Sequence, residues 1–250
     1  LRSSVSKSVA ACCRAMRWSV RGANRLDASA VRSQSKARVW CAFMREFRQS
    51  SRMPDMELLL IRHAPTPGNL EKRYIGRTDE PIMQPLPVPI PSYPQVERVY
   101  ISPMLRCRQT AQLLFGGCKP LILEDLRECD FGAFEGKKSA QLCGASRYRA
   151  WIAGDLDAPP GGESAAAFRS RCCAAFGHAV RLCIRDKIAR AAFVAHGGTL
   201  MAILERYANA REAQSFYAWQ AAPLCGRAAT TTSDSWIREQ PPFDIQPLGG

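Results

Sequence analysis

Two short apolar runs stand out along the chain, and each of them ends in a histidine. Leu58–Ile61 consists of four aliphatic residues followed by Arg62 and His63, and Ala191–Ala195 is followed by His196. Strands covered on both faces of a parallel sheet lose the alternation of apolar and polar residues, so both runs predict buried parallel strands. Open α/β sheets hold ligands at the carboxyl ends of their strands, and both histidines fall at such ends.

The pattern between and after these runs predicts further strands and helices. Two shorter strands are expected at 96–102 and 120–123, and helical patterns cover 104–115, 139–152, 163–184 and 199–208. The first of these helices should start just after Ser102 and Pro103, a good N-cap and first-turn pair. Residues 215–219 read as a short apolar element. The tail beyond Leu224 gives no clear pattern.

The connection at 81–94 is rich in proline, with Pro85, Pro87, Pro89 and Pro91 in alternate positions. Proline removes a backbone donor and clashes with the preceding helical turn, so no ordinary helix forms at this spacing. We therefore expect an extended, polyproline-like connection that leaves one face of the sheet less covered.

The formal net charge of +13 is concentrated at the start of the chain. Residues 1–55 hold 12 of the 35 Lys and Arg but only 3 of the 22 Asp and Glu, which accounts for +9 of the charge. A basic balance usually suggests nucleic acid or an anionic membrane as a partner. Because the core carries little of this charge, we expect neither partner. No apolar run approaches the ~20 residues of a membrane-spanning helix.

The basic segment is interpreted as separate from the folded domain. Its Arg- and Ser-rich, acid-poor composition is also that of organellar transit peptides, whereas it lacks the apolar core of a secretory signal. Met56 directly precedes the first predicted strand. We therefore interpret 1–55 as a basic leader or a mis-assigned start, and 56–250 as one α/β domain.

The cysteines and the third histidine have structural interpretations. Eleven cysteines are scattered without zinc-type pairs, which favours a reduced, cytoplasmic compartment. Cys107 and Cys173 lie on predicted helices and are expected to be small buried residues. His178, inside the helix at 163–184, is expected to be structural or exposed.

Several polar residues near the strand ends are candidates for anion binding or acid–base chemistry. Arg106 falls in the first turn of a predicted helix, where the macrodipole opposes a cation unless an anion is bound. Thr66 and Asn69 can either bind an anion or cap a turn. Glu128 is a candidate acid, but composition does not rank it against its neighbours Asp125, Asp130 and Glu135.

Four blocks, in this order, resemble the signature of the histidine phosphatase (phosphoglycerate mutase-like) superfamily. They are Arg62-His63-Ala64 with Thr66 and Asn69, the stretch 102–111 around Arg106, Glu128 within 126–132, and His196-Gly197-Gly198. The resemblance covers roughly 57–225 and departs from the family at Ala64, where glycine is frequent. It implies a three-layer α/β/α sandwich around a mostly parallel sheet.

The resemblance also implies roles for these residues. His63 would be the nucleophile that forms a phosphohistidine, and Glu128 and His196 would complete the catalytic set. The substrate phosphate would be bound by Arg62, Thr66, Asn69, Arg106 and Gly197. No metal or other cofactor is implied, and the expected partner is a small phosphomonoester.

Within the superfamily, the acidic segment 128–137 looks like the phosphatase branch, and the core lacks the longer insertions of the mutases. Together with 106–111 and 159–163, this segment is similar to the alpha-ribazole phosphatases of cobalamin biosynthesis. Two alternatives stay open. One is a phosphoglycerate mutase-type phosphotransferase, and the other is a non-catalytic binding protein that carries a basic leader.

Overall fold

The computed structural model describes residues 55–208, 216–232, 236 and 243–248. The leader expected at 1–55 therefore lies, except for Asp55, outside the described residues. Within the described part, one mixed sheet is flanked by helices, and the expected strands at 58–61, 96–102, 120–123 and 191–195 are all present in it.

The sheet contains six strands in the order β3-β2-β4-β1-β5-β6. Their bounds are β1 Met56–Arg62, β2 Arg98–Ile101, β3 Leu121–Ile122, β4 Arg190–Ala195, β5 Gly226–Thr231 and β6 Asp244–Leu248. Strands β1 to β4 are parallel, and β5 runs antiparallel to both of its neighbours. The two histidine-bearing strands, β1 and β4, are adjacent at the centre.

The helices are α3 Pro67–Leu70, α4 Leu105–Phe115, α5 Ser139–Leu142, α6 Ser146–Ala153, α7 Ala165–Arg185 and α8 Gly197–Tyr207. Short 3-10 turns lie at η1 Glu124–Leu126, η2 Gly132–Phe134 and η4 Phe216–Trp219. The single helix predicted at 139–152 is wrong, because it is divided into α5 and α6. Gly144 lies in the turn between them, and glycine disfavours a helix interior.

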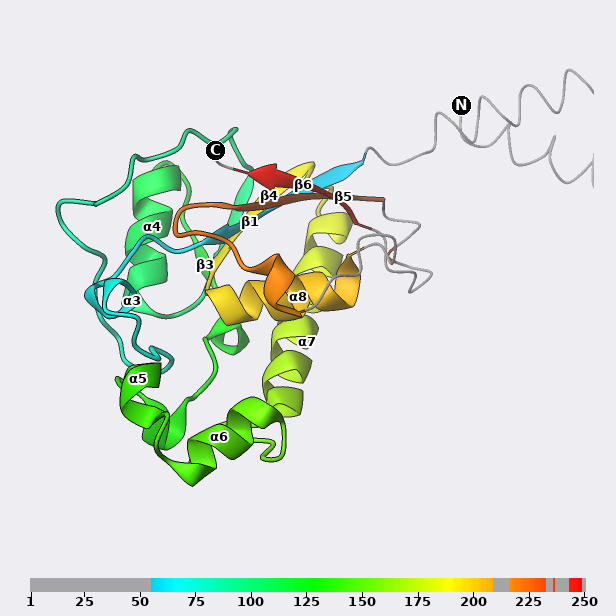
Figure 1. Cartoon of the computed structure of the whole chain (residues 1–250). Helices are drawn as coiled ribbons and strands as arrows, with labels where there is room; N and C mark the ends of the chain where they lie inside the picture. Colours follow the sequence, from blue (N-terminus) through cyan, green and yellow to red (C-terminus); the bar gives the residue numbers. More distant parts are fainter. Residues whose placement is uncertain (1–54, 209–215, 233–235, 237–242, 249–250) are drawn as a thin grey trace, which may run out of the picture. The chain divides into compact units, whose positions relative to one another are not determined.

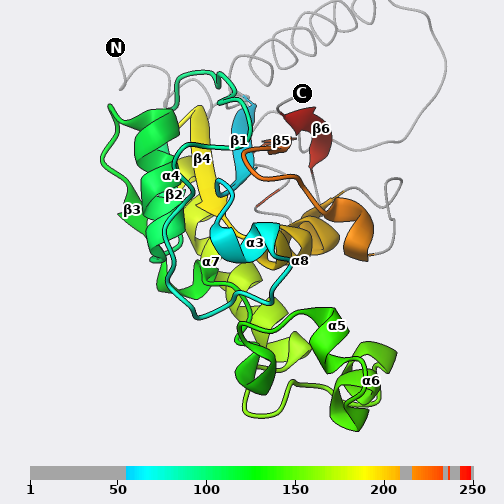
Figure 2. The same cartoon turned by 60° about the vertical axis from the view of Figure 1, so that its left-hand side comes forward.

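The helices form a layer on each face of the sheet. Leu58 and Leu60 of β1 share a buried cluster with residues of α7 and α8, whereas Leu59 and Ile61 pack with residues of α4. Figures 1 and 2 show α4 on one side of the sheet and α7 and α8 on the other. All four side chains are fully buried, and burial of each contributes about 1.5–3 kcal/mol. The predicted three-layer arrangement is confirmed.

The last part of the chain differs from the expectation, because β5 and β6 follow Leu224, where no element was predicted. The sequence of β5, from Gly226 to Thr231, is mostly small residues with little strand preference. It is a strand because it pairs with β1 from Met56 to Ile61. The pairing also requires a glycine at its start, since a Cβ on Gly226 would overlap the Leu60 carbonyl.

The proline-rich connection contains no helix, as predicted. It is tied to the core by Ile82, which is buried, and by Tyr93, which packs beside α4. Among the described residues, no helix combines the length and the apolar character needed to cross a bilayer.

Candidate active site

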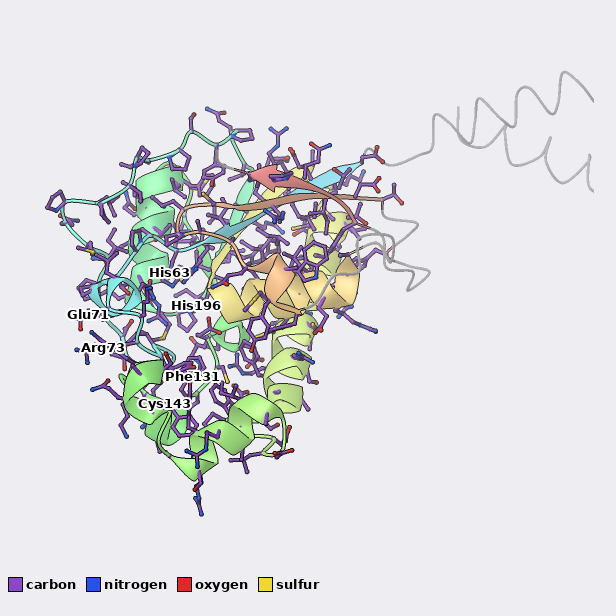
Figure 3. All side chains as sticks on the ribbon, viewed as in Figure 1. His63, Glu71, Arg73, Phe131, Cys143 and His196 are labelled. Atoms are coloured by element: carbon purple, nitrogen blue, oxygen red, sulfur yellow. The ribbon has the colours of Figure 1, made fainter. Side chains whose placement is uncertain are left out.

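The ends of β1 and β4 bring His63 and His196 together. Arg62 pairs with Ala195 in the parallel ladder, so the residue after each strand emerges at the same edge. The amide of His63 donates to the Ala195 carbonyl at 3.0 Å. The imidazole centroids lie 5.2 Å apart with the rings inclined at 65°. Both side chains are labelled in Figure 3. Both side chains are buried.

The His63 ring is held in one tautomer. Nδ1 lies 2.7 Å from the Ala64 carbonyl, which can only accept, so Nδ1 carries the proton and Nε2 the free lone pair. The pKa of His63 is lowered to about 3, first by burial and then by the nearby cations Arg106 and Arg62. His63 is therefore a neutral imidazole near pH 7.

Arg106, at the start of α4, is fully buried and contacts His196 directly. Its Nε donates to Nδ1 of His196 at 3.2 Å, so the His196 proton lies on Nε2, which donates to Oγ of Ser102 at 2.7 Å. Burial, and then Arg106, hold the pKa of His196 well below its usual value. His196 is therefore also neutral, with both ring nitrogens engaged.

The rest of the Arg106 guanidinium is held by backbone carbonyls. Nη2 donates to Gly76 at 2.9 Å and Nη1 to Thr78 at 2.8 Å. Within the described residues, no carboxylate forms an ion pair with it. Three of the five N–H groups of a guanidinium are used, which leaves two for an anion.

Arg62 contributes a second cation at the end of β1. Nη1 donates to the Ala221 carbonyl at 2.8 Å, whereas Nε is buried without a hydrogen-bond partner among the described residues. Burial lowers the pKa of Arg62, and Glu128 opposes this effect. A buried donor without a partner is costly, so this guanidinium is suited to an acceptor that enters with a ligand.

Glu128 is placed against the N-terminus of α8. Oε2 accepts from the Gly198 amide at 2.9 Å, and Oε1 accepts from the Cys129 amide at 3.0 Å. Burial raises the pKa of the Glu128 carboxyl, although both amides and the two arginines act in the opposite direction. A Cβ on Gly198 would overlap Oε1, so a glycine is needed at this contact.

The competing acids have other partners. Asp130 accepts from the Gly132 amide at 2.8 Å and lies 3.7 Å from Arg77, and Asp125 is exposed. Glu135 accepts from the backbone of the segment 76–78. Of the four acids considered, only Glu128 lines the cavity in front of His63.

Thr66 and Asn69 form a reciprocal cap on α3. Thr66 Oγ1 accepts from the Asn69 amide, and Asn69 Oδ1 accepts from the Thr66 amide, each at 3.3 Å. Of the two expected roles, anion binding and turn capping, their contacts with each other are those of a turn cap. Asn69 also lines the cavity, whereas Thr66 is fully buried and does not. Gly197, the first residue of α8, lines the cavity beside the Arg62 guanidinium.

Two buried hydroxyls at the site were not predicted to act there. The N-cap of α4 is Met104 and not Ser102, because the Ser102 hydroxyl is bound to His196; Asp79 instead accepts from the Leu105 amide at 2.6 Å. Thr110 accepts from the Ala64 amide at 2.9 Å and donates to the Arg106 carbonyl at 2.6 Å. Both lie in the stretch 102–111, and its resemblance to the superfamily signature is the sequence feature from which their place at the site could have been predicted.

Most residues that the sequence analysis expected to be structural or exposed are buried or exposed accordingly. His178 is exposed and Cys107 is fully buried, whereas Cys173, which was expected to be buried, is only half-buried. In the part of the chain that the structure describes, no three His, Cys, Asp or Glu side chains are grouped to hold a metal ion.

The cavity in front of His63 has a volume of about 610 Å³. Arg62, His63, Glu128 and the first residues of α8 form its polar end. Six aromatic side chains also line it, and these are Tyr74, Phe131, Trp151, Phe168, Phe216 and Tyr217. The Tyr74 ring lies 5.1 Å from that of Phe131 and 5.7 Å from that of Trp151. Figure 3 shows Phe131 between the histidines and the helices α5 and α6.

Comparisons with known proteins agree with this fold. The putative alpha-ribazole-5'-P phosphatase from Escherichia coli K-12 is similar, with a TM-score of 0.61, 22% identity, and coverage of 78% of this chain and 96% of that one. The alpha-ribazole phosphatase from Shigella flexneri has a TM-score of 0.59 and 21% identity over 78% and 96% of the two chains. At these identities both matches show the fold alone.

A phosphoglycerate mutase from Thermus thermophilus matches with a TM-score of 0.52 and 27% identity over 78% of this chain and 99% of that one. No curated protein matches the sequence. The family model described as histidine phosphatase superfamily (branch 1) matches residues 92–238, a range that includes Arg106, Glu128 and His196. Since this range is more than half of the chain, the chain belongs to the histidine phosphatase superfamily.

Proposed function

We propose that this chain hydrolyses phosphomonoesters through a phosphohistidine on His63, without a metal. The observation that carries the proposal is the bond from His63 Nδ1 to the Ala64 carbonyl, at 2.7 Å. It leaves Nε2 with a free lone pair, and His63 lines the cavity. A neutral imidazole with one fixed tautomer is a competent nucleophile for phosphoryl transfer near pH 7.

The reaction has two steps, formation of the phosphohistidine and its hydrolysis. Nε2 of His63 attacks phosphorus in line with the ester oxygen, and the N–P bond forms as the P–O bond breaks. Glu128, whose carboxyl pKa is raised by burial, gives its proton to the leaving alcohol. Water then attacks the phosphohistidine, the ionised Glu128 takes a proton from it, and inorganic phosphate leaves.

The remaining polar groups would stabilise the phosphoryl oxygens. Arg62 has an unpartnered Nε, and Arg106 has two unused N–H groups, so both can donate to the equatorial oxygens. The amide of Gly197, at the N-terminus of α8 where anions are favoured, would join them. His196, whose ring nitrogens are engaged by Arg106 and Ser102, would complete the catalytic set by orienting Arg106. Asn69 would contribute from the cavity edge. Thr66 would act through Asn69, because its own hydroxyl caps α3.

The outer part of the cavity favours a large, ring-bearing alcohol. Its volume of about 610 Å³ is within the range of sites for drug-sized ligands, and aromatic walls bind flat apolar groups. The outer cations already carry carboxylate partners, since Arg73 lies 2.7 Å from Glu71 and Arg169 lies 3.3 Å from Glu205. The acid group of a small leaving alcohol would therefore find neither Arg73 nor Arg169 without a carboxylate partner.

Alpha-ribazole 5'-phosphate fits this description, and two of the similar structures are those of an alpha-ribazole phosphatase and a putative one. We therefore propose alpha-ribazole phosphatase activity, as would serve cobalamin biosynthesis in the cytoplasm. The second candidate is phosphoglycerate mutase activity, which is favoured by the similarity to the Thermus phosphoglycerate mutase.

A substrate panel tests both candidates. Phosphate release is measured with alpha-ribazole 5'-phosphate, 3-phosphoglycerate and simple alkyl phosphates, and interconversion of 2- and 3-phosphoglycerate is followed in parallel. The proposal expects the largest kcat/KM for the ring-bearing ester. Interconversion that outpaces phosphate release would favour the mutase, and no turnover of any ester would favour the non-catalytic alternative.

A further inference from the structure

Glu135, which lies just after η2, contacts the segment that holds Arg106. Its Oε1 accepts three hydrogen bonds, from the Gly76 amide at 2.8 Å, the Thr78 amide at 3.0 Å and the Thr78 hydroxyl at 2.7 Å. Its Oε2 is buried and has no hydrogen-bond partner among the described residues. Oε1 therefore binds the Glu135 carboxylate to Gly76 and Thr78, whereas Oε2 has no donor near it among the described residues.

The carbonyls of Gly76 and Thr78 face Arg106. Gly76 and Thr78 each donate an amide hydrogen to Glu135 and each accept from the Arg106 guanidinium, at 2.9 and 2.8 Å. The carboxylate and the guanidinium therefore form a separated charge pair with two backbone residues between them. The carboxylate thus fixes the backbone of the two residues whose carbonyls hold the guanidinium, and its negative charge lies on the far side of that backbone from Arg106.

The segment 76–79 is also fixed at both of its ends. A Cβ on Gly76 would overlap the Cys129 carbonyl, so this residue is packed tightly against the backbone that follows Glu128. Asp79 accepts from the Leu105 amide at 2.6 Å, at the start of the helix that bears Arg106. A shift of this segment would therefore move Arg106 relative to Glu128.

We propose that Glu135 is a positioning residue, and the remote counter-charge, for Arg106. A buried cation without a counter-charge is costly. A carboxylate in direct contact with Arg106 would occupy the two unused N–H groups and repel the substrate phosphate. Placing the charge behind Gly76 and Thr78 stabilises the cation and leaves both N–H groups without a protein acceptor among the described residues. This role rests on the proposed function, in which Arg106 binds the phosphoryl group.

A double-mutant cycle tests the proposal. We expect Glu135→Ala to lower kcat/KM for p-nitrophenyl phosphate on the order of 10–100-fold, the range seen when residues that orient metal ligands are removed. In an Arg106→Ala background the same substitution should cost less than about 2-fold, because coupled residues are not additive. Equal losses in the two backgrounds would overturn the proposal, since a general structural defect acts regardless of Arg106.

Two further measurements keep the test decisive. Glu135→Gln retains an acceptor oxygen but removes the charge, and it replaces Glu135→Ala in the cycle if the latter does not fold. Glu124→Gln, at an exposed carboxylate of η1, is the matched control and should leave kcat/KM unchanged. Binding of inorganic phosphate, measured by calorimetry, should weaken in the Glu135 variant even if the chain proves not to be a phosphatase. Unchanged phosphate affinity in a folded Glu135 variant would refute the positioning role.

Discussion

Arg106 donates through Nε to Nδ1 of His196 at 3.2 Å, and this bond determines which nitrogen of His196 carries a proton. The proton is placed on Nε2 and shared with Ser102. The same guanidinium is among the causes that lower the pKa of His63. Burial is the main cause that keeps both histidines neutral, and this one buried cation adds to it. Its bond to His196 also ties α4 to the end of β4.

The nucleophile assignment predicts that His63→Ala abolishes turnover while the protein stays folded. No contact in the site can replace the lone pair on Nε2. Acid-quench labelling with a phosphorylated substrate should give acid-labile, base-stable phosphate on the wild type and none on the variant. Retention of more than a few per cent of turnover by a folded variant would contradict the assignment.

The lowered pKa values predict an unusual pH dependence of stability. Both histidines are neutral in the folded state well below pH 6.5, whereas in the unfolded chain they take up protons near that value. The unfolded state thus binds more protons, and the free energy of unfolding should fall as the pH decreases from about 6.5 towards 3. The slope reaches about 1.4 kcal/mol per pH unit for each histidine.

Chemical denaturation at a series of pH values measures this slope. His63→Gln should remove the share of the slope that belongs to His63, while His178→Gln, at an exposed position on α7, should leave it unchanged. A wild-type stability that stays flat between pH 6.5 and 4 would contradict the burial of two neutral histidines.

The contact between Gly198 and Glu128 predicts a large effect of one methyl group. Because a Cβ at Gly198 would overlap Oε1, Gly198→Ala must displace the carboxylate from the N-terminus of α8. We expect a loss of kcat on the order of 10²-fold, within the range of general acid catalysis. Gly144→Ala is the control, since a Cβ there meets nothing within 4 Å. Equal activity of the two variants would show that the position of Glu128 is not critical.

The basic leader is predicted to be dispensable. Residues 1–55 lack patterned apolar surface that could pack, and β1 begins at Met56. Deletion of 1–55 should leave both kcat/KM and the melting temperature essentially unchanged. A large drop in melting temperature would show that the segment docks on the core.

The sequence predicted the parts of the site that depend on local pattern. The runs before His63 and His196 are continuous because the strands are buried on both faces, so their ends could be located and paired. The tautomers could not be predicted, since they depend on contacts such as that of His196 with Ser102, 94 residues apart in sequence. The strand β5 was missed for a similar reason, because its pairing with β1 and not its composition makes it a strand.

The role of Glu128 can be separated from that of its acidic neighbours by the leaving group. A general acid matters most when the departing alkoxide is a strong base, as in an alkyl or ribosyl phosphate, and matters little for nitrophenolate. Glu128→Gln should therefore cost on the order of 10²–10⁴-fold on an alkyl phosphate and far less on p-nitrophenyl phosphate. Kinetics with matched pairs of esters measure this difference.

Two neighbouring acids provide the controls for the leaving-group test. Asp130→Asn should show no leaving-group dependence, because Asp130 bonds the Gly132 amide and lies near Arg77. Glu135→Gln should slow both esters by the same factor, since a residue that orients Arg106 acts on the phosphoryl group that the two substrates share. Equal slowing of both esters by Glu128→Gln would make its role one of pocket electrostatics. A differential effect at Asp130 would mean that the general acid is Asp130.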